Sequence, residues 1–227
     1  MKNRLLAVLT VEEEKRLLPH MEKVSLPLKQ LIFSPDQPIE YIYFPINGLI
    51  SVVAIMENGQ AIEVGTVGNE GMVGIPVLLS SDRMPFEAFA QIPGEAMRMK
   101  ADVFKTQVPY CKDFHVRLQR YTMASMNQLA QLVACNCLHT VEERFSRWML
   151  MTQDRVGSEK FLMTHEFLSE MLGVRRASVS VIAGAFKKAG LIDYSRGEIS
   201  ILDRPGLEAA SCECYQIIKD EFERLLN

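Results

Sequence analysis

The chain has 227 residues, of which 48% are apolar, and its net charge is −3 at pH 7. This length suits one large domain or two modest ones, and the charge is unlike the strong basicity of chains that attract nucleic acid through their overall field. The five cysteines are odd in number and scattered, which favours reduced thiols over a disulfide framework and predicts a cytoplasmic protein. The apolar run of residues 5–9 is shorter than a signal-peptide core, and no run approaches the roughly 20 apolar residues of a membrane span, so we expect no membrane partner.

The first hundred residues change from a helical to a β-type pattern. Thr10-Val-Glu-Glu13 is a capping box, and Leu17, Leu18 and Met21 follow at helical spacing, which predicts an N-terminal helix. Short β-type runs come next, at residues 30–33, 41–44, 49–55, 61–64 and 88–92. They are separated by the turn signals Pro35-Asp36, Asn47-Gly48, Asn58-Gly59 and Pro93-Gly94. Many short strands with frequent turns predict an antiparallel β-roll of jelly-roll type within residues 1–108.

Residues 109–139 predict one long helix of roughly 40 Å, because a helix rises 1.5 Å per residue. A loose heptad-like seam on this helix predicts the interface of a homodimer. The seam consists of Leu118, Tyr121, Ser125, Leu129 and Leu132. The alternative is a helix that packs only on its own β-domain. A second capping box, Thr140-Val-Glu-Glu143, predicts that the long helix breaks near residues 138–140, which makes this point the hinge before a third segment of residues 140–227.

The third segment carries the pattern of a winged helix-turn-helix. Thr164 is a good N-cap for a short apolar helix, Gly173 supplies a turn, and Val179, Ile182 and Phe186 hold a second helix at helical spacing. Residues 191–202 then predict a hairpin, the wing, with Arg196-Gly197 at its tip. The fold class predicted for the whole chain is therefore α+β, with a β-roll, a long dimerisation helix and a C-terminal winged helix-turn-helix.

A helix-turn-helix reads double-stranded DNA with the exposed first turns of its second helix. The residues predicted to contact DNA are Thr164, Arg175, Arg176, Ala177, Ser178, Ser180, Val181 and Arg196. Arg176 is the best candidate for bidentate guanine recognition, and Ser178 and Ser180 suit phosphate contacts that fix register. Ala177 and Val181 are predicted to contact thymine methyl groups. Any one of these residues alone would as readily be a solvated surface residue.

The whole chain resembles the Crp/Fnr superfamily of transcription regulators. The motifs that carry the resemblance are Val141-Glu-Glu-Arg-Phe-Ser-Arg-Trp-Met-Leu-Met151, Thr164-His-Glu-Phe-Leu-Ser-Glu-Met-Leu-Gly173, Ala189-Gly-Leu-Ile-Asp-Tyr194 and Asp203-Arg-Pro-Gly-Leu-Glu208. The resemblance implies a homodimer that binds a pseudo-palindromic operator, a sensor domain that responds to a small molecule and, for an activator, RNA polymerase as a further partner. The protein is therefore expected not to be an enzyme.

The predicted sensor departs from the cyclic-nucleotide binders of this family. Those members hold the ribose and phosphate with a Gly-Glu pair and an Arg-Ser element, whereas Ile75 follows Gly74 here and Arg83 stands one residue early. An apolar side chain cannot accept a ribose hydroxyl, and a buried phosphate needs its arginine. The candidate effector pocket is Gly71, Gly74, Ile75, Arg83 and Phe86. The alternatives are a cyclic-nucleotide site in which Arg83 shifts register, or an apolar core without a ligand.

The sequence predicts neither a cofactor nor a metal site. Cys135-Asn-Cys137 near His139, and Cys212-Glu-Cys214, were candidates for redox or metal pairs, but a two-residue step does not place both thiols on one helix face. Jelly-roll barrels also host metal oxygenases with histidine ligands inside the barrel. All four histidines, His20, His115, His139 and His165, lie outside residues 24–99, which argues against such an enzyme.

Overall fold

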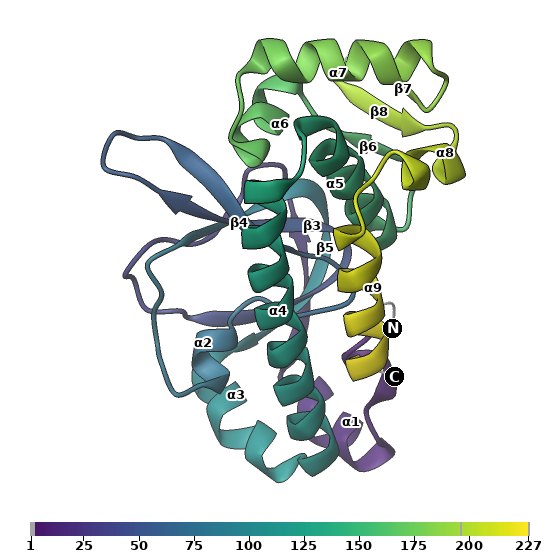
Figure 1. The fold of residues 1–227 in the computed structure, drawn as a ribbon. Coiled ribbons are helices and arrows are strands. Elements are labelled where there is room, and N and C mark those ends of the chain that lie inside the picture. The colour runs from purple at the N-terminus through teal and green to yellow at the C-terminus, as the bar shows by residue number, and fades with distance from the viewer. Residues whose placement is uncertain (1–2, 196, 227) are drawn as a thin grey trace.

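The structure is a computed structural model that describes residues 3–195 and 197–226. A rolled β-domain lies beside the long helix α4 (Lys112–Leu138), and a winged helix lies beyond the C-terminal end of that helix (Figure 1). The elements of the β-domain are, in chain order, η1 (Leu6–Val8), α1 (Val11–Leu17), η2 (Leu18–His20), β1 (Met21–Leu26), β2 (Leu31–Phe33), β3 (Tyr41–Ile55), β4 (Ala61–Val67), α2 (Ile75–Leu78), β5 (Glu87–Lys100), α3 (Ala101–Gln107) and η3 (Val108–Tyr110). After α4 come α5 (Val141–Val156), β6 (Lys160–Leu162), α6 (His165–Leu172), α7 (Arg176–Lys188), β7 (Ile192–Ser195), β8 (Glu198–Ile201), α8 (Arg204–Ala209) and α9 (Cys214–Leu226).

The N-terminal sheet is antiparallel, with strand order β1-β5-β3-β4 and β2 paired to β5. The predicted turn Asn58-Gly59 does join β3 to β4. Asn47-Gly48 and Pro93-Gly94 were expected to separate strands, and this prediction is wrong, because β3 and β5 run through them. The two sites lie opposite each other on β3 and β5, where the pairing register of the two strands shifts. There Asn47 Oδ1 accepts a hydrogen bond from the backbone N–H of Glu95 at 2.7 Å. Gly48 has φ +78, so it bends the strand instead of closing a hairpin.

The N-terminal helix begins as predicted and ends earlier. Thr10 accepts the backbone N–H of Glu13, and Glu13 accepts that of Thr10, which completes the capping box of α1. Pro19 lacks the backbone N–H that would continue the α-helical hydrogen bonds, and the chain runs on after Leu17 as the short helix η2. Met21, expected on this helix, instead begins β1, a strand that the sequence pattern missed.

The break between α4 and α5 lies where the second capping box predicts it. His139 is the C-cap of α4 with an extended backbone, and Thr140 caps α5 by exchanging hydrogen bonds with Glu143. Helix α5 is then buried along most of its length, from Arg144 to Thr152. It therefore forms the shared core between the two domains.

The winged helix consists of α5 to α7 and a three-stranded sheet of order β6-β8-β7. Helix α6 contacts the β-domain directly, since the rings of Phe167 and Phe89 meet edge to face with centroids 5.9 Å apart. The winged helix is thus packed on the N-terminal sheet.

The last helix returns to the N-terminal half of the molecule. In Figure 1, α9 (yellow) runs beside α4. The rings of Tyr121 and Phe222 lie 6.2 Å apart, and Arg117 donates to the carbonyl of Leu226. The predicted third segment of residues 140–227 grouped this helix with the winged helix, whereas its apolar face packs on α4. Among the described residues, no helix combines the length and apolarity needed to cross a bilayer.

Candidate DNA-binding surface and sensor cavity

The predicted recognition helix α7 presents its polar side to solvent. Val179, Ile182 and Phe186 are buried at the spacing that the sequence predicted, and they hold α7 against the core. The opposite side is exposed at Arg175, Arg176, Ala177, Ser178, Ser180 and Val181. Val181 is 72% exposed, so its side chain is free to contact a partner. The exposed side of α7 is therefore free to enter the major groove of DNA.

The first helix of the motif holds α7 in place through specific contacts. Thr164 caps α6 by accepting the N–H of Phe167 at 3.2 Å. His165 Nδ1 lies 3.0 Å from Ser180 Oγ, and its ring stacks on Tyr194 of the wing with centroids 4.2 Å apart. Burial and the nearby Arg176 charge lower the pKa of His165, so the neutral ring links α6, α7 and the wing. Ser180, predicted as a phosphate contact, thus has a partner within the protein.

The charges on this surface are exposed and weakly paired. Arg176 Nη1 lies 3.4 Å from Glu166 Oε2, and both side chains are about two-thirds exposed. Such a pair contributes little to stability and is easily exchanged for a phosphate or a base. Arg175 is the N-cap of α7 and makes no capping hydrogen bond with its side chain. Arg196, predicted at the wing tip, lies outside the described residues.

A cavity of about 410 Å³ lies between β4 and α4, where the β-domain meets the long helix. Its apolar lining includes Ile75, Met84, Phe86, Leu129, Leu132 and Phe222. Of the predicted pocket residues, Ile75 and Phe86 do line it. Such a mostly apolar, partly open space with a few polar groups is typical of a small-molecule site.

The other three predicted pocket residues do not line this cavity. A side chain on Gly71 would overlap the ring of Tyr121, and one on Gly74 would overlap Ile42, so both glycines allow close packing. Arg83 is exposed and pairs with Asp82 at 3.1 Å. The described structure therefore gives the cavity no arginine at the place where a cyclic-nucleotide phosphate would require it.

Glu63 forms the polar end of the cavity. Its carboxylate accepts hydrogen bonds from Trp148 Nε1 and from Ser51 Oγ, each at 2.9 Å. Burial raises the pKa of Glu63 to about 7, although these two hydrogen bonds and the charges of Arg147 and Arg155 oppose the shift. No local sequence pattern predicts this contact, because 85 residues separate Glu63 from Trp148.

A buried ion pair joins the two domains beside the cavity. Arg155 Nε of α5 lies 2.9 Å from Glu70 Oε1, and the two side chains are 6% and 8% exposed. The same guanidinium donates to Gln128 of α4 at 2.6 Å and to Thr66 of β4. Because one side chain binds β4, the loop after it and α4, the orientation of α5 depends on the N-terminal sheet and on α4.

Part of the predicted dimer seam on α4 is buried within the chain itself. Leu118 is fully buried in the chain's own core, and Tyr121 is buried with its hydroxyl donating to the carbonyl of Met72. Tyr121, Ser125, Leu129 and Leu132 line the sensor cavity, because this face of α4 packs on β4. Leu129 is nevertheless 44% exposed, so intramolecular contacts occupy the seam only in part, and the dimer interface stays a prediction.

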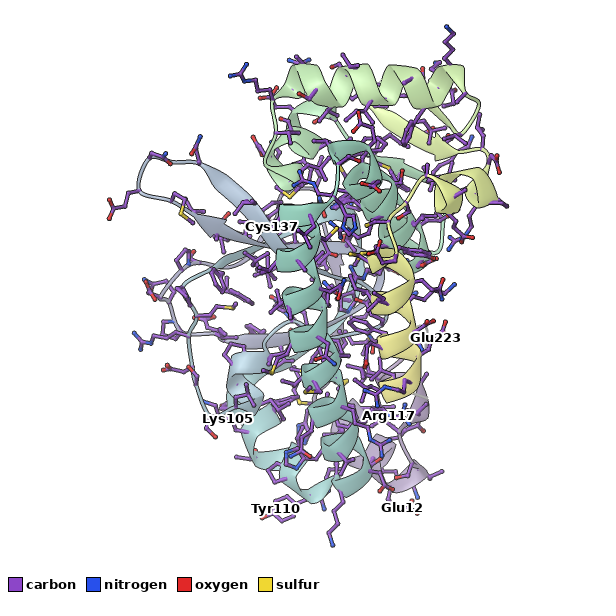
Figure 2. All side chains as sticks on the ribbon, in the orientation of Figure 1. Glu12, Lys105, Tyr110, Arg117, Cys137 and Glu223 are labelled. Carbon is purple, nitrogen blue, oxygen red and sulfur yellow. The ribbon has the colours of Figure 1, made fainter. Side chains whose placement is uncertain are left out.

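An exposed stripe of α4, which adjoins the cavity at Val133, has a regular heptad spacing. Its members alternate at steps of three and four residues, as in a coiled-coil seam. They are Val116, Gln119, Met123, Met126, Ala130, Val133 and Cys137, all exposed. Figure 2 shows Cys137 at the winged-helix end of this helix. Five of these seven side chains are Val, Met or Ala, so this heptad face of α4 is mostly apolar although it is exposed to solvent.

Comparison with known proteins agrees with both halves of this architecture. Residues 23–108 match the family model of the cyclic nucleotide-binding domain, and residues 143–210 match that of the Crp-like helix-turn-helix domain. The fold and the exposed recognition helix thus define a transcription regulator with a DNA-binding helix-turn-helix, and not an enzyme. The chain belongs to the Crp/Fnr family, as its sequence motifs predicted.

Characterised relatives are distant in sequence and close in organisation. The chain is 18% identical over 179 residues to the global nitrogen regulator of Synechocystis sp., covering 75% of this chain and 80% of that protein. It is 23% identical over 196 residues to the transcriptional regulator SdrP of Thermus thermophilus, covering 82% and 93%. The solved structure of FixK2 from Bradyrhizobium japonicum superposes with a TM-score of 0.72 at 16% identity, covering 85% of this chain and 98% of that one. At such identity the structural likeness supports the fold.

Proposed function

We propose that this chain acts as a homodimer that recognises a pseudo-palindromic DNA operator through α7. The observation that carries the proposal is the exposed first turn of α7, with Arg175 and Arg176 at its start and apolar Val181 one turn on. A planar guanidinium matches the O6 and N7 acceptors of guanine, and an exposed Val matches a thymine methyl. The operator should therefore combine a guanine with A·T-rich steps in each half-site.

The heptad face of α4 supports the dimeric part of the proposal. Two copies packed along this face would be related by a two-fold axis, and the operator would share that symmetry. The two copies of α7 must then lie about 34 Å apart to enter successive major grooves. Such a dimer would work in the cytoplasm, where the free thiols stay reduced, and would meet RNA polymerase when it activates transcription.

For the sensor, we propose a small apolar effector and not a cyclic nucleotide. The cavity is lined mainly by aliphatic and aromatic side chains, and its polar end is the carboxyl of Glu63 instead of an arginine. A phosphate there would face the Glu63 carboxyl, and the nearby Arg155 is already paired with Glu70. Calorimetric titration with cyclic AMP and cyclic GMP should therefore show no binding, and saturable binding of either would overturn this part.

The DNA-binding proposal is tested by selecting sites from a random duplex pool with the purified full chain and no added ligand. The Arg176→Ala variant should lose the two-fold symmetric motif, with affinity for the wild-type motif about 10–100-fold lower. Arg224→Ala is the matched control, because Arg224 is similarly exposed (63% against 68% for Arg176) and lies on α9, away from α7. Equal enrichment by the wild type and by Arg176→Ala would contradict the role assigned to α7.

A further inference from the structure

Four potential metal ligands converge where α4 ends and α9 begins. They are the thiols of Cys135, Cys212 and Cys214 and the imidazole of His139, and all four ligand atoms lie within 4.8 Å of one another. Cys135 and Cys214 are fully buried, Cys212 is nearly so, and the His139 side chain is 17% exposed. Free thiols with an imidazole nitrogen are the donor set of a structural zinc site.

The distances fit a tetrahedral ion. Cys135 Sγ lies 3.5 Å from Cys212 Sγ, and Cys214 Sγ lies 3.6 Å from His139 Nδ1. With Zn–S bonds of about 2.3 Å and a Zn–N bond of about 2.0–2.1 Å, a tetrahedron has edges of about 3.8 Å between sulfurs and about 3.6 Å between sulfur and nitrogen. The four donors are therefore close to the arrangement that coordination requires.

The local backbone explains why the sequence pattern did not reveal the site. Cys135 and His139 are four residues apart and so lie on one face at the end of α4. Cys212 precedes α9, and Cys214 is the first residue of that helix, so the two-residue step between them is not a helical one. The partner of Cys135 is His139, one turn along α4, and not Cys137, which is exposed.

The groups around the cluster resemble the outer shell of a metal site. Gln131 Nε2 donates to Cys214 Sγ at 3.1 Å, and Glu213 Oε2 lies 3.2 Å from His139 Nε2. A carboxylate on the far nitrogen of a histidine fixes the tautomer that presents the other nitrogen to the ion. Here that other nitrogen is Nδ1, the one that faces Cys214.

The packing and the charges point the same way. The three buried cysteines form a small apolar cluster of their own, apart from the main core. Arg147 is 5% exposed and donates a hydrogen bond to Met151 Sδ, and its Nε has no hydrogen-bond partner among the described residues. Its charge acts on Cys135. Three thiolates and one divalent cation carry a net negative charge, which would balance such a buried guanidinium.

We propose that Cys135, His139, Cys212 and Cys214 bind one Zn²⁺ ion in a tetrahedral site that ties the start of α9 to the C-terminal end of α4. The site adjoins the α4–α5 break at Thr140, on which the placement of the winged helix depends. Occupancy would hold residues on both sides of the winged helix, 139 before it and 212 after it, at one point. The winged helix would then be fixed at both ends.

The test measures bound metal in the purified full chain, with no reference to DNA. After incubation with Zn²⁺ and removal of the excess, the wild type should retain about one ion per chain. Replacement by Co²⁺ should give the absorption bands of thiolate-bound tetrahedral cobalt. Cys135→Ser and Cys214→Ser should lose both signals.

Two cysteine variants are matched controls. Cys137→Ser changes an exposed thiol two residues from Cys135 on the same helix, and Cys111→Ser changes a buried thiol outside the cluster. Both should keep the full metal content and the cobalt bands. Glu213→Gln leaves all four ligands in place and should weaken Zn²⁺ binding by about 10–100-fold, whereas Glu223→Gln, exposed on α9, should not. This pair keeps the test valid where a cysteine variant fails to fold.

Two outcomes would overturn the proposal. One is a folded wild-type chain that retains no zinc and shows no thiolate–cobalt bands at excess metal. The other is equal metal retention by the wild type and by folded Cys135→Ser and Cys214→Ser. Mass spectrometry distinguishes a third case. If the chain purified under reducing conditions is lighter by two hydrogens and its digest contains Cys135 cross-linked to Cys212, the cluster is a disulfide, which also overturns the proposal.

Discussion

The indole Nε1 of Trp148 donates a hydrogen bond of 2.9 Å to Oε1 of Glu63, which joins α5 to strand β4 of the sensor sheet. Glu63 also lines the sensor cavity, so one carboxyl group contacts both the candidate ligand space and the core of the DNA-binding half. A ligand that changes the charge or position of this carboxyl would act directly on α5. The first prediction therefore concerns this group.

Glu63→Gln should remove a pH-dependent loss of stability. The pKa of Glu63 is raised from 4.5 to about 7 by burial, so between these values the unfolded chain has released the proton that the folded chain still binds. Stability therefore falls as pH rises through this window, by at most about 3 kcal/mol for this group. Glutamine keeps an acceptor for Trp148 and carries no charge. In urea denaturation, the free energy of unfolding of the variant should equal that of the wild type at pH 4 and exceed it at pH 8.

The control for this prediction is Glu57→Gln, since Glu57 is exposed in the β3–β4 turn. Its stability should follow the wild-type pH profile. A wild-type pH profile in Glu63→Gln would show that the carboxyl of Glu63 does not titrate in this range.

Arg155→Met should be strongly destabilising. It removes the ion-pair partner of the buried Glu70 and two further hydrogen bonds, to Thr66 of β4 and Gln128 of α4, and breaking a buried pair typically costs about 3–5 kcal/mol. Arg224→Met breaks the exposed pair with Glu221 and should cost less than about 1 kcal/mol. Guanidinium denaturation of both variants gives the comparison. Similar losses of stability in the two variants would show that the Arg155 contacts do not hold α5 to the rest of the molecule.

Met126→Glu should convert the proposed dimer to a monomer. Met126 is 58% exposed at the middle of the heptad face of α4, and two glutamates facing each other across a two-fold seam would repel in an apolar setting. Leu31→Glu is the matched control, because Leu31 is 50% exposed on β2, away from α4. Sedimentation velocity should show monomer for the first and dimer for the second. A dimer in both would move the interface elsewhere.

Thr140→Ala should affect DNA binding as well as stability. Thr140 caps α5 at the break after α4, and loss of such a cap typically costs about 1 kcal/mol. Thr10→Ala removes a capping box of the same pattern from α1, which lies far from the winged helix. Both variants should lose similar stability in thermal denaturation, while only Thr140→Ala should weaken operator binding in a fluorescence anisotropy titration. Equal operator affinity in the two variants would exclude the α4–α5 break as a hinge.

The sequence by itself determined the features that neighbouring residues decide. Thr10 and Thr140 specify the starts of α1 and α5, and the apolar spacing of Val179, Ile182 and Phe186 specifies α7. These features depend on hydrogen bonds and side-chain contacts within about one helical turn, so they are visible in a short stretch of chain. The family motifs are of the same kind, and they gave the class of protein correctly.

The tertiary structure alone decided which residues from distant segments meet. The pattern of α4 offers two apolar faces, and only the packing of β4 and α9 shows that Tyr121 faces inward while Met126 faces solvent. Asn47-Gly48 has the local chemistry of a hairpin turn, but pairing with β5 keeps β3 continuous through it. Cys135 and Cys212 are 77 residues apart, and Glu63 and Trp148 are 85 apart. Such contacts arise from the close packing of the whole chain, to which no local stretch of sequence is a guide.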